Sequence, residues 1–429
     1  MKKFITALIL AAVFIIAATA ANGDNIVKMY TAEKPNTTGS APTGTEEYDD
    51  EIQTMSMKDG ESFKILCLTD THIESQNSAN KLISILENLV KAHKPDLVVF
   101  TGDNLDQWQY APYFGYNAYV NTVGHVNYGK LALDGSVAAK FKELYQLYGT
   151  KWCGIMGNHD RDPGGSGTKS QNDYLVRLAE DGSYGCLYTE GIAYNTPGDG
   201  YYDWKPNNDL PFHKYGDYII NIKDKGEVIY SLAFMDSGQH FSPGNDINGY
   251  ISGEQVNWYK ANMQQNAVAK YGELDIEKGY FIPSLVFIHQ PIPEFVFAAQ
   301  LAAANTNGTG FIKEGYGFGY NGESPTTRIQ REDVNYGLFA AVKEVGGTDI
   351  ICGHNHDNNS TIYYDGVRLN YNNRTGRRGS ENWPDSRINY AKMYTISPNT
   401  YEMLVEFAMP GAENSHITTT ALTTANIQR

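Results

Sequence analysis

The sequence is poor in positive charge. It has 34 lysines and arginines against 49 aspartates and glutamates, which gives a formal net charge of −15 at pH 7. Nucleic-acid binding relies on clustered lysine and arginine side chains that contact phosphates, so this composition argues against an electrostatic nucleic-acid partner. An anionic substrate would therefore need a local source of positive charge in its binding site.

Long hydrophobic runs are missing after the first twenty residues. Residues 1–20 combine Lys2 and Lys3 with an apolar stretch and a small-residue ending, a pattern typical of a cleaved secretory signal peptide. An uncleaved membrane anchor is the alternative, but the apolar stretch is shorter than the roughly 20 residues of a spanning helix. We therefore expect an exported protein, periplasmic or extracellular, with no membrane span after signal cleavage.

The sequence contains four cysteines, too few for a disulfide-rich scaffold. Cys67, Cys153 and Cys352 each lie in a short apolar run before a polar motif, where a cysteine behaves as a small buried hydrophobic residue. Cys186 lies in turn-rich sequence, and its state is left open. A chain of 429 residues is long enough to bury a sizeable core without such crosslinks.

The organisation of the chain changes along its length. Residues 21–60 are rich in Thr, Gly, Pro, Glu and Asp without periodicity and are interpreted as a flexible linker. Residues 61–410 form the predicted folded domain, and 411–429 a C-terminal tail. The long connections 106–129 and 305–331 are either rims of a functional site or surface insertions.

Within the predicted domain, short apolar runs alternate with helical apolar periods. The runs are rich in β-branched residues, as expected for strands that are buried on both faces. Strand, helix and strand in repetition predict a layered α/β fold. The runs are 63–69, 96–101, 152–156, 229–236, 283–289 and 348–352, and the helical periods lie at 82–90, 137–148 and 334–345.

Potential metal ligands follow five of these runs. Ligands bind at the carboxyl ends of strands in α/β sheets, so five strand ends would deliver their polar residues to one place. Each cluster alone is weak evidence for a metal site, because a strand-end Asp more often caps a turn. Five such clusters, each directly after a strand, are not expected by chance. The clusters are Asp70 and His72; Asp103; Asn158, His159 and Asp160; His289; and His354 and His356.

In this order and spacing, "DTH", "GDN", "GNHD", "FIH" and "GHNH" resemble the five blocks of the calcineurin-like metallophosphoesterases, a superfamily that includes the purple acid phosphatases. The resemblance covers roughly residues 63–407, and the stretches between the blocks are similar to the purple-acid-phosphatase-like branch. It implies a four-layer αββα sandwich with mixed sheets and two metal ions at the carboxyl ends of the strands.

The resemblance also implies roles for individual residues. His159 would be the general acid that protonates the leaving oxygen, and Asp160 would help to orient it. Asp103 would bridge the two ions. The remaining ligands would be Asp70, His72 and His356 for the first ion and Asn158, His289 and His354 for the second.

The chemistry of these side chains agrees with the implied site. Carboxylate, amide and imidazole ligands suit divalent Mn, Fe or Zn. Two ions about 3.5–4 Å apart clamp the attacking and leaving oxygens and lower the pKa of a bound water. Purple enzymes carry a tyrosinate three residues beyond the bridging aspartate, where this chain has Asp106. We therefore expect a colourless protein with a non-redox metal pair.

The sequence thus predicts an exported dinuclear metal-dependent phosphoesterase that hydrolyses small phosphate monoesters by attack of a metal-activated hydroxide. Arg374 and Arg161 are candidates for contact with the substrate phosphate, although loop arginines are more often solvated. A phosphodiesterase acting on nucleotides or glycerophosphodiesters is one alternative. A non-catalytic surface binding protein with structural metals is another, and the oligomeric state stays open.

Overall fold

The computed structural model describes residues 52–106, 114, 134–161, 166–189, 216–238, 249–325, 335–377 and 391–408, with the backbone alone at 118–120, 126–128, 161 and 166–173. These residues belong to one compact unit, Asp49–Arg429. The signal peptide at 1–20, most of the linker and the tail at 411–429 lie outside the described residues and stay predictions. No helix in the described segments is long and apolar enough to cross a membrane.

The larger of two main sheets has eight strands. Four central strands, β8, β9, β13 and β15, run parallel to one another, while β7 and β14 are antiparallel to their neighbours β8 and β15. In spatial order the strands are β1 (Ile52–Ser56), β7 (Tyr218–Asp224), β8 (Glu227–Phe234), β9 (Ser284–Phe287), β13 (Asp349–Cys352), β15 (Val367–Tyr371), β14 (Thr361–Tyr364) and β11 (Gly317–Phe318).

The second main sheet has five strands. Its strands β2, β3 and β6 are parallel, and β16 joins β2 in an antiparallel pair. The spatial order is β17 (Met403–Ala408), β16 (Ala391–Ile396), β2 (Phe63–Leu68), β3 (Leu97–Thr101) and β6 (Lys151–Ile155). The predicted runs at 63–69, 96–101, 152–156, 229–236, 283–289 and 348–352 therefore correspond to β2, β3, β6, β8, β9 and β13.

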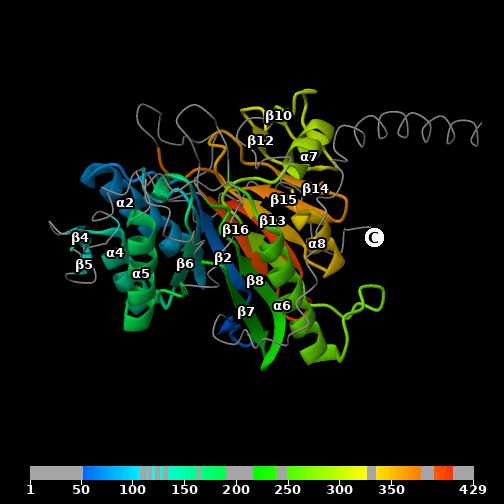
Figure 1. Cartoon of the computed structure of the whole chain (residues 1–429), viewed down its shortest axis with the longest axis horizontal. Coiled ribbons are helices and arrows are strands. Elements are labelled where there is room, and N and C mark those ends of the chain that lie inside the picture. Colours follow the sequence, from blue (N-terminus) through cyan, green and yellow to red (C-terminus); the bar gives the residue numbers. More distant parts are fainter. Residues whose placement is uncertain are drawn as a thin grey trace, which may run out of the picture. The chain divides into compact units, whose positions relative to one another are not determined.

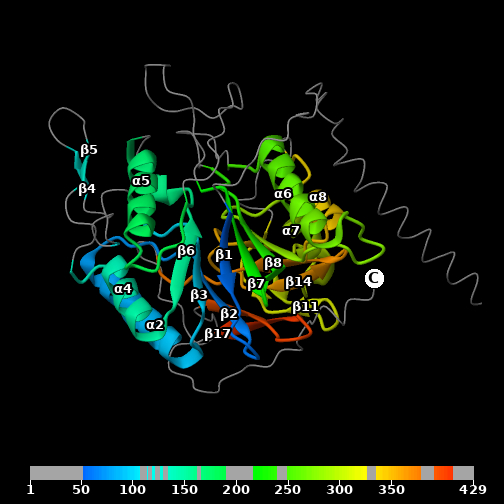
Figure 2. The same ribbon diagram turned by 90° about the horizontal axis from the view of Figure 1, so that it is seen from below.

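Helices cover the outer face of each sheet, which gives four layers (Figures 1 and 2). The five-stranded sheet is covered by α2 (Gln76–His93), α4 (Val137–Tyr148) and α5 (Ser166–Asp181). The eight-stranded sheet is covered by α6 (Gly253–Tyr271), α7 (Glu294–Ala302) and α8 (Leu338–Glu344). The mixed α/β sandwich predicted from the sequence is confirmed.

Helix α2 shows how the sequence builds one of these outer layers. Ser75 caps its first turn in a capping box with Ser78, and Lys94 ends it in the left-handed conformation. The predicted apolar stripe is buried and packs in the core. That stripe consists of Leu82, Ile85, Leu86, Leu89 and Val90.

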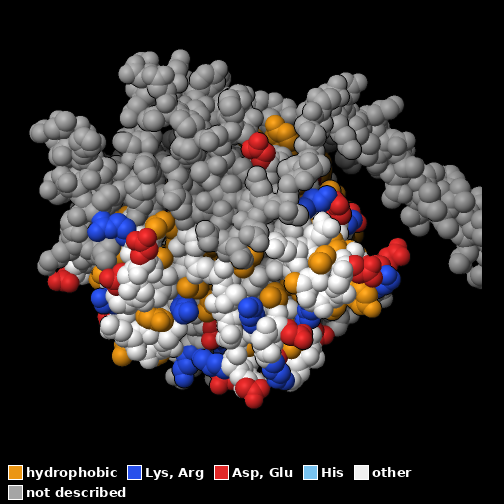
Figure 3. Space-filling model, turned by 60° about the horizontal axis from the view of Figure 1, so that its bottom comes forward, with side chains coloured by type: hydrophobic (Ala, Val, Ile, Leu, Met, Phe, Trp, Pro, Cys, Tyr) orange, Lys and Arg blue, Asp and Glu red, His pale blue; other side chains and the backbone are white. Residues whose placement is uncertain are grey.

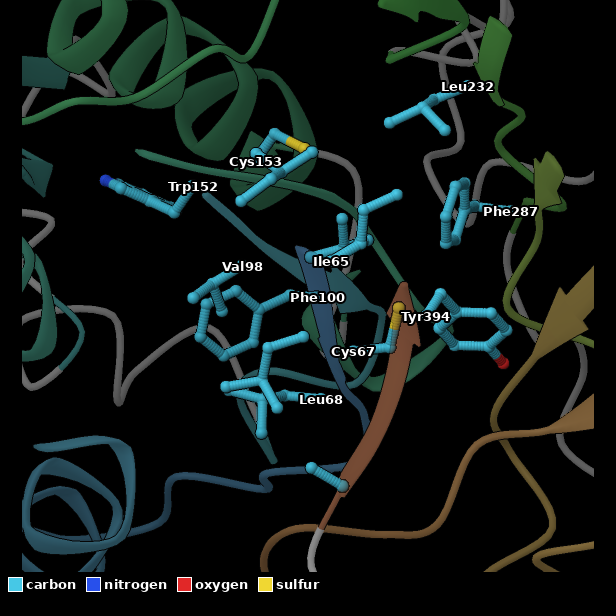
Figure 4. Close-up of a cluster of buried hydrophobic side chains, with 14 of the residues drawn as sticks. Ile65, Cys67, Leu68, Val98, Phe100, Trp152, Cys153, Leu232, Phe287 and Tyr394 are labelled. Atoms are coloured by element: carbon cyan, nitrogen blue, oxygen red, sulfur yellow. The ribbon is translucent and has the colours of Figure 1, made fainter. Parts of the chain in front are cut away.

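The two sheets face each other across an apolar core. Figure 4 shows Ile65 and Cys67 of one sheet opposite Leu232 and Phe287 of the other, with Tyr394 beside them. All four cysteines of the chain are free and buried, which confirms the prediction for Cys67, Cys153 and Cys352 and settles the state of Cys186. The core therefore relies on packing and not on crosslinks.

The predicted linker extends too far. Residues 52–56, placed in the linker 21–60, form β1, which pairs in parallel with β7. The amide of Met57 continues this pairing by donating to the carbonyl of Lys223 at 2.8 Å. The strand was missed because it lies at the sheet edge with several half-exposed residues, and its partner lies far away in the sequence.

The two long connections, 106–129 and 305–331, attach to different parts of the fold. In 106–129, Phe114 is buried against Phe100 and Trp152, with ring centroids 5.8 and 5.9 Å apart, and β4 (Ala118–Val120) pairs with β5 (Val126–Tyr128). In 305–331, β10 (Gly310–Phe311) pairs with β12 (Tyr320–Asn321). The amide of Gly322 donates to the carbonyl of Asp357 at 2.8 Å, which attaches this connection beside the "GHNH" block.

On the face shown in Figure 3, acidic and basic side chains are interspersed. Exposed ion pairs such as Lys278 with Glu273, at 2.8 Å, combine the two signs locally. Exposed pairs of this kind contribute little to stability, because water screens both charges.

Candidate metal centre

The predicted ligands come from parallel strands of both sheets. Asp70 and His72 follow β2, Asp103 follows β3 and Asn158 follows β6, while the remaining histidines follow β9 and β13 of the other sheet. Hydrogen bonds join the two sheets at this edge. The amide of His354 donates to Asp70 Oδ2 at 3.0 Å. The strand-end clusters of the sequence are thereby brought together.

The backbone of this edge is unusual. Asp70, His72, Asp103 and His354 have positive φ angles of 48°, 41°, 50° and 72°. Such angles are uncommon for residues other than glycine and cost free energy, so they persist where the surrounding structure enforces them. Here the amides of Asp70 and His72 donate to the carbonyls of Gly102 and Asp103, each at 3.0 Å.

Two motif glycines allow the ligand loops to approach closely. A Cβ at Gly157 would overlap the carboxylate of Asp103, and a Cβ at Gly353 would overlap Thr69 Oγ1 and lie 2.6 Å from Asp70 Oδ2. A side chain at either position would displace an aspartate that is a predicted ligand. The glycines of "GNHD" and "GHNH" are therefore explained by contact between loops.

Three donors form the first group of possible ligands: Asp70, His72 and His356. The Nε2 atoms of the two histidines lie 3.0 Å apart, and Asp70 Oδ1 lies 3.4 Å from His356 Nε2 and 3.7 Å from His72 Nε2. All three residues are buried. Asp70 Oδ1 has no hydrogen-bond partner in the described part of the chain. A cation among these atoms would satisfy it, so the group fits a metal ion.

The second group consists of Asp103, His289 and His354, again all buried. Asn158 adds an amide oxygen, because its Oδ1 lies 3.2 Å from His289 Nε2. Asp103 Oδ2 lies 3.2 Å from His289 Nε2 and 3.8 Å from His72 Nε2 of the first group. One carboxylate oxygen thus lies between both groups, as a bridging ligand would.

Opposite charges stabilise one another in this buried site. Burial would raise the pKa of Asp70, but the neighbouring imidazoles of His356 and His72 hold that pKa well below its usual range. Burial would lower the pKa of His289, but the carboxylate of Asp103 raises it to about 9. An arriving metal ion would replace the imidazole protons, because imidazole binds metals in its neutral form.

Two further contacts orient the imidazoles. His289 Nδ1 donates to the carbonyl oxygen of Thr101 at 2.8 Å, and His72 Nδ1 lies 3.5 Å from Asp106 Oδ1. Both leave Nε2 directed at the centre, which is the usual arrangement around metal-binding histidines. This contact of Asp106 was not predicted from the sequence, although Asp106 lies only three residues after Asp103.

His159 and Asp160 follow Asn158 in a short 3₁₀ turn, His159–Arg161. The backbone amide of His159 donates to Asp103 Oδ1 at 2.8 Å. Its ring is half-buried, with its centroid 5.4 Å from that of His72. The side chain predicted as the general acid is therefore close to the first group.

Asp160 connects the ligand loops. Its Oδ1 accepts from the amide of Leu105 at 2.8 Å, and its Oδ2 accepts from the amide of Gly157 at 2.7 Å. Burial, reinforced by the charge of Asp103, raises the pKa of Asp160 to about 6. These contacts fasten the loops that carry Asp103 and Asn158, so an orienting effect on His159 would act through the backbone.

The two candidate arginines differ in what the structure describes. Arg374 is buried, and its backbone pairs with Thr69 beside the first group. The side chain of Arg161 lies outside the described residues, so its predicted contact with substrate stays a prediction.

The donors as a set fit divalent first-row metals. They combine imidazole nitrogens with carboxylate and amide oxygens, a mixture that suits Mn, Fe and Zn, whereas Mg and Ca prefer oxygen alone. The free cysteines are not among the grouped donors. The residues therefore fit the metal pair expected from the sequence.

A family model for "Calcineurin-like phosphoesterase" matches residues 63–358. The chain belongs to this family. The matched residues contain every strand-end cluster described above, so the family match and the geometry concern the same edge of the sandwich.

Relatives of the chain include two proteins from Arabidopsis thaliana and one from Saccharomyces cerevisiae. "Probable inactive purple acid phosphatase 29" is 25% identical over 67% of this chain and 61% of its own length. "Probable inactive purple acid phosphatase 14" is 23% identical over 69% and 62%. The yeast "Phosphatase DCR2" is 23% identical over 73% and 47%. The chain thus spans less than two thirds of these relatives' lengths.

A solved structure similar to this chain is a dimetal phosphatase from Danio rerio. It is 11% identical, with a TM-score of 0.43, over 84% of this chain and 98% of that chain.

Proposed function

We propose that the protein hydrolyses phosphate monoesters with two bound metal ions. The observation that carries this proposal is the sharing of Asp103 between two buried donor groups, with His159 beside them. Asp70, His72 and His356 would hold one ion, and Asn158, His289 and His354 the other. When bound, such ions neutralise phosphate charge and lower the pKa of water towards neutrality.

The reaction would be a hydrolysis without a covalent intermediate. A bond forms between the water oxygen and phosphorus as the bond from phosphorus to the leaving oxygen breaks. His159 gives a proton to that leaving oxygen, and the attacking water loses a proton to solvent. General acid assistance of this kind contributes about 10²–10⁴ in rate.

The plant relatives are called inactive in their names, so the activity of this chain needs its own support. That support is the complete set of donors at one edge, together with the half-buried His159. A protein with structural metals alone would have no need for an acid at this position. We therefore favour catalysis over the alternative of a non-catalytic binding protein.

Export is part of the same proposal. Lys2, Lys3 and the apolar stretch that follows them support a signal peptide. The substrate would then be a phosphate ester outside the cytoplasm. Expression of the full chain with N-terminal sequencing of the secreted product tests this. Cleavage near Ala20 supports export, whereas an intact N-terminus in the cell fraction contradicts it.

The activity is tested by metal analysis of the purified protein alongside a panel of esters. We expect turnover of p-nitrophenyl phosphate and alkyl phosphates to exceed turnover of bis(p-nitrophenyl) phosphate. Faster turnover of the diester would favour the phosphodiesterase alternative. Full metal content without hydrolysis of any ester would favour a binding protein.

A further inference from the structure

A further strand of the eight-stranded sheet ends at the metal centre without contributing a predicted ligand. The chain leaves β15 and crosses to the loop that carries Asp70. The amide of Thr375 donates to the carbonyl of Thr69 at 2.8 Å, and the amide of Gly376 donates to the carbonyl of Asp70 at 3.1 Å. Residues 372–376 are therefore fixed against the first group of donors.

Arg374 lies beside that group. Its backbone pairs with Thr69, the residue before Asp70. Its Nη2 lies 3.8 Å from Oδ1 of Asp357, the residue after His356. The backbone and the guanidinium of Arg374 thus lie beside the sequence neighbours of two predicted ligands, Asp70 and His356.

The contact between Arg374 and Asp357 is loose. The distance of 3.8 Å is long for an ion pair, and the Asp357 side chain is 53% exposed, whereas that of Arg374 is 8% exposed. Guanidinium offers five N–H donors in a planar fork that matches carboxylate or phosphate oxygens. A guanidinium at this position is of the chemical type that binds phosphoryl oxygens.

Asn373 supplies an independent indication of a ligand. Its side chain is fully buried, and neither its Nδ2 nor its Oδ1 has a hydrogen-bond partner among the described residues. Buried carboxamides are normally hydrogen-bonded, because an unpaired polar group costs free energy. A polar ligand at the end of β15 would remove that cost.

We propose that Asn373 and Arg374 form a phosphoryl-binding subsite that selects monoesters, an inference that rests on the proposed function. A phosphate monoester carries a charge of about −1.5 to −2 at neutral pH on three terminal oxygens. A diester carries one negative charge on two such oxygens. A guanidinium at this position favours the more highly charged group through charge-assisted hydrogen bonds.

The chain offers a matched control in Arg377. It belongs to the same segment, and its Nη2 lies 3.7 Å from Glu74 Oε1, with 35% of its side chain exposed. Arg377→Gln therefore removes the same charge from the outer side of the same loop. A general loss of positive charge would affect both variants, whereas a specific subsite is affected by Arg374 alone.

The experiment is calorimetric titration of orthophosphate into the metal-loaded, full-length protein. Arg374→Gln should weaken orthophosphate binding by about 10- to 100-fold. It should keep its metal content and lower kcat/KM for monoesters more than for diesters. Arg377→Gln should stay within about two-fold of the parent, as expected for a screened surface charge.

Unchanged orthophosphate affinity in Arg374→Gln with full metal content overturns the subsite. If Arg374→Gln loses its metal, the orthophosphate affinity of Asn373→Ala tests the subsite instead. This variant removes no hydrogen bond within the described protein, so it should fold and bind metal but hold orthophosphate several-fold more weakly. Parent-like affinity in Asn373→Ala then counts against the subsite.

The two proposals can fail separately. A parent protein that binds orthophosphate through Arg374 but hydrolyses no ester would retain the subsite and refute the proposed function. A protein that hydrolyses monoesters equally well with Arg374→Gln would retain the function and refute the subsite.

Discussion

Two buried clusters of charged side chains differ in how fully the protein satisfies them. Between the sheets, Arg368 donates through Nε and Nη2 to the two carboxylate oxygens of Asp349, at 2.8 and 2.7 Å. Asn370 Nδ2 also donates to Asp349 Oδ1, at 3.1 Å. At the carboxyl edge, Asp70 Oδ1 accepts no hydrogen bond within the described segments. The first cluster is complete by itself, while the second fits an added cation.

This difference separates a structural role from a functional one. A bidentate arginine–carboxylate pair with its remaining groups hydrogen-bonded holds neighbouring strands in place and needs nothing further. Strained backbone and unpaired ligand atoms, in contrast, persist at sites where binding or catalysis requires them. Changes in the first cluster should therefore act on stability, and changes in the second on metal content and rate.

The largest effect is expected for Asp103→Asn. This variant removes the carboxylate shared by both donor groups, so it should lose metal and lower kcat/KM by at least about a thousand-fold. Metal content and p-nitrophenyl phosphate turnover are measured on the same sample. Asp365→Asn, which removes a carboxylate that is 67% exposed, is the control and should match the parent. Full metal content in Asp103→Asn would contradict the bridging role.

His159→Asn should keep its metal and lose about 10²–10⁴ in kcat on alkyl phosphates, because the leaving alkoxide then departs without a proton. The loss should be smaller on p-nitrophenyl phosphate, whose leaving group needs less assistance. Steady-state kinetics on both substrates measure the contrast. His93→Asn, at the end of α2, provides the control. Equal losses on the two substrates would argue against His159 as the acid.

In the cluster of Asp349, Arg368 and Asn370, the substitution Asp349→Asn should lower the free energy of unfolding by about 3–5 kcal/mol. It leaves Arg368 buried without its counter-charge. Urea unfolding monitored by circular dichroism gives the free energy of unfolding. The variant that remains folded should still bind metal and turn over substrate. A loss of metal without a loss of stability would contradict the structural role of Asp349.

The smallest effect concerns Lys392, which lies near the same cluster and donates to Ser360 O at 3.0 Å and Thr361 Oγ1 at 2.8 Å. Burial lowers its pKa to about 7 from 10.5. Between these values the unfolded chain binds more protons than the folded one, so stability rises with pH.

Lys392→Met removes this dependence. Below pH 7, the free energy of unfolding of the variant should exceed that of the parent by on the order of 1 kcal/mol or more. This difference should shrink as the pH rises towards about 10. Urea unfolding at several pH values measures it. A difference between parent and variant that does not change with pH would show that Lys392 stays charged in the folded protein.

The same contrast explains how much the sequence could predict. Strands β2, β3, β6, β9 and β13 are continuous apolar runs followed by polar motifs, so both the strands and the predicted ligands beyond them were visible locally. Parallel strand ends meet at one edge, which made the convergence of Asp70, Asp103 and His289 predictable as well.

Features that depend on distant pairing were not predictable. Strand β1 is recognisable only beside β7, and the pairing of Asp349 with Arg368 requires the register of β13 with β15. The contact of Asp106 with His72 and the burial of Asn373 likewise arise only when separate loops are packed together. Sequence patterns report local propensity, whereas these features are tertiary.

We expect this edge of the sandwich to hold two cations, one on either side of Asp103. Crystals of the metal-loaded protein, measured at the absorption edge of the bound metal, test this expectation. We predict two anomalous peaks, one among Asp70, His72 and His356 and one among Asn158, His289 and His354. A single peak at saturating metal, or peaks away from Asp103, would contradict it.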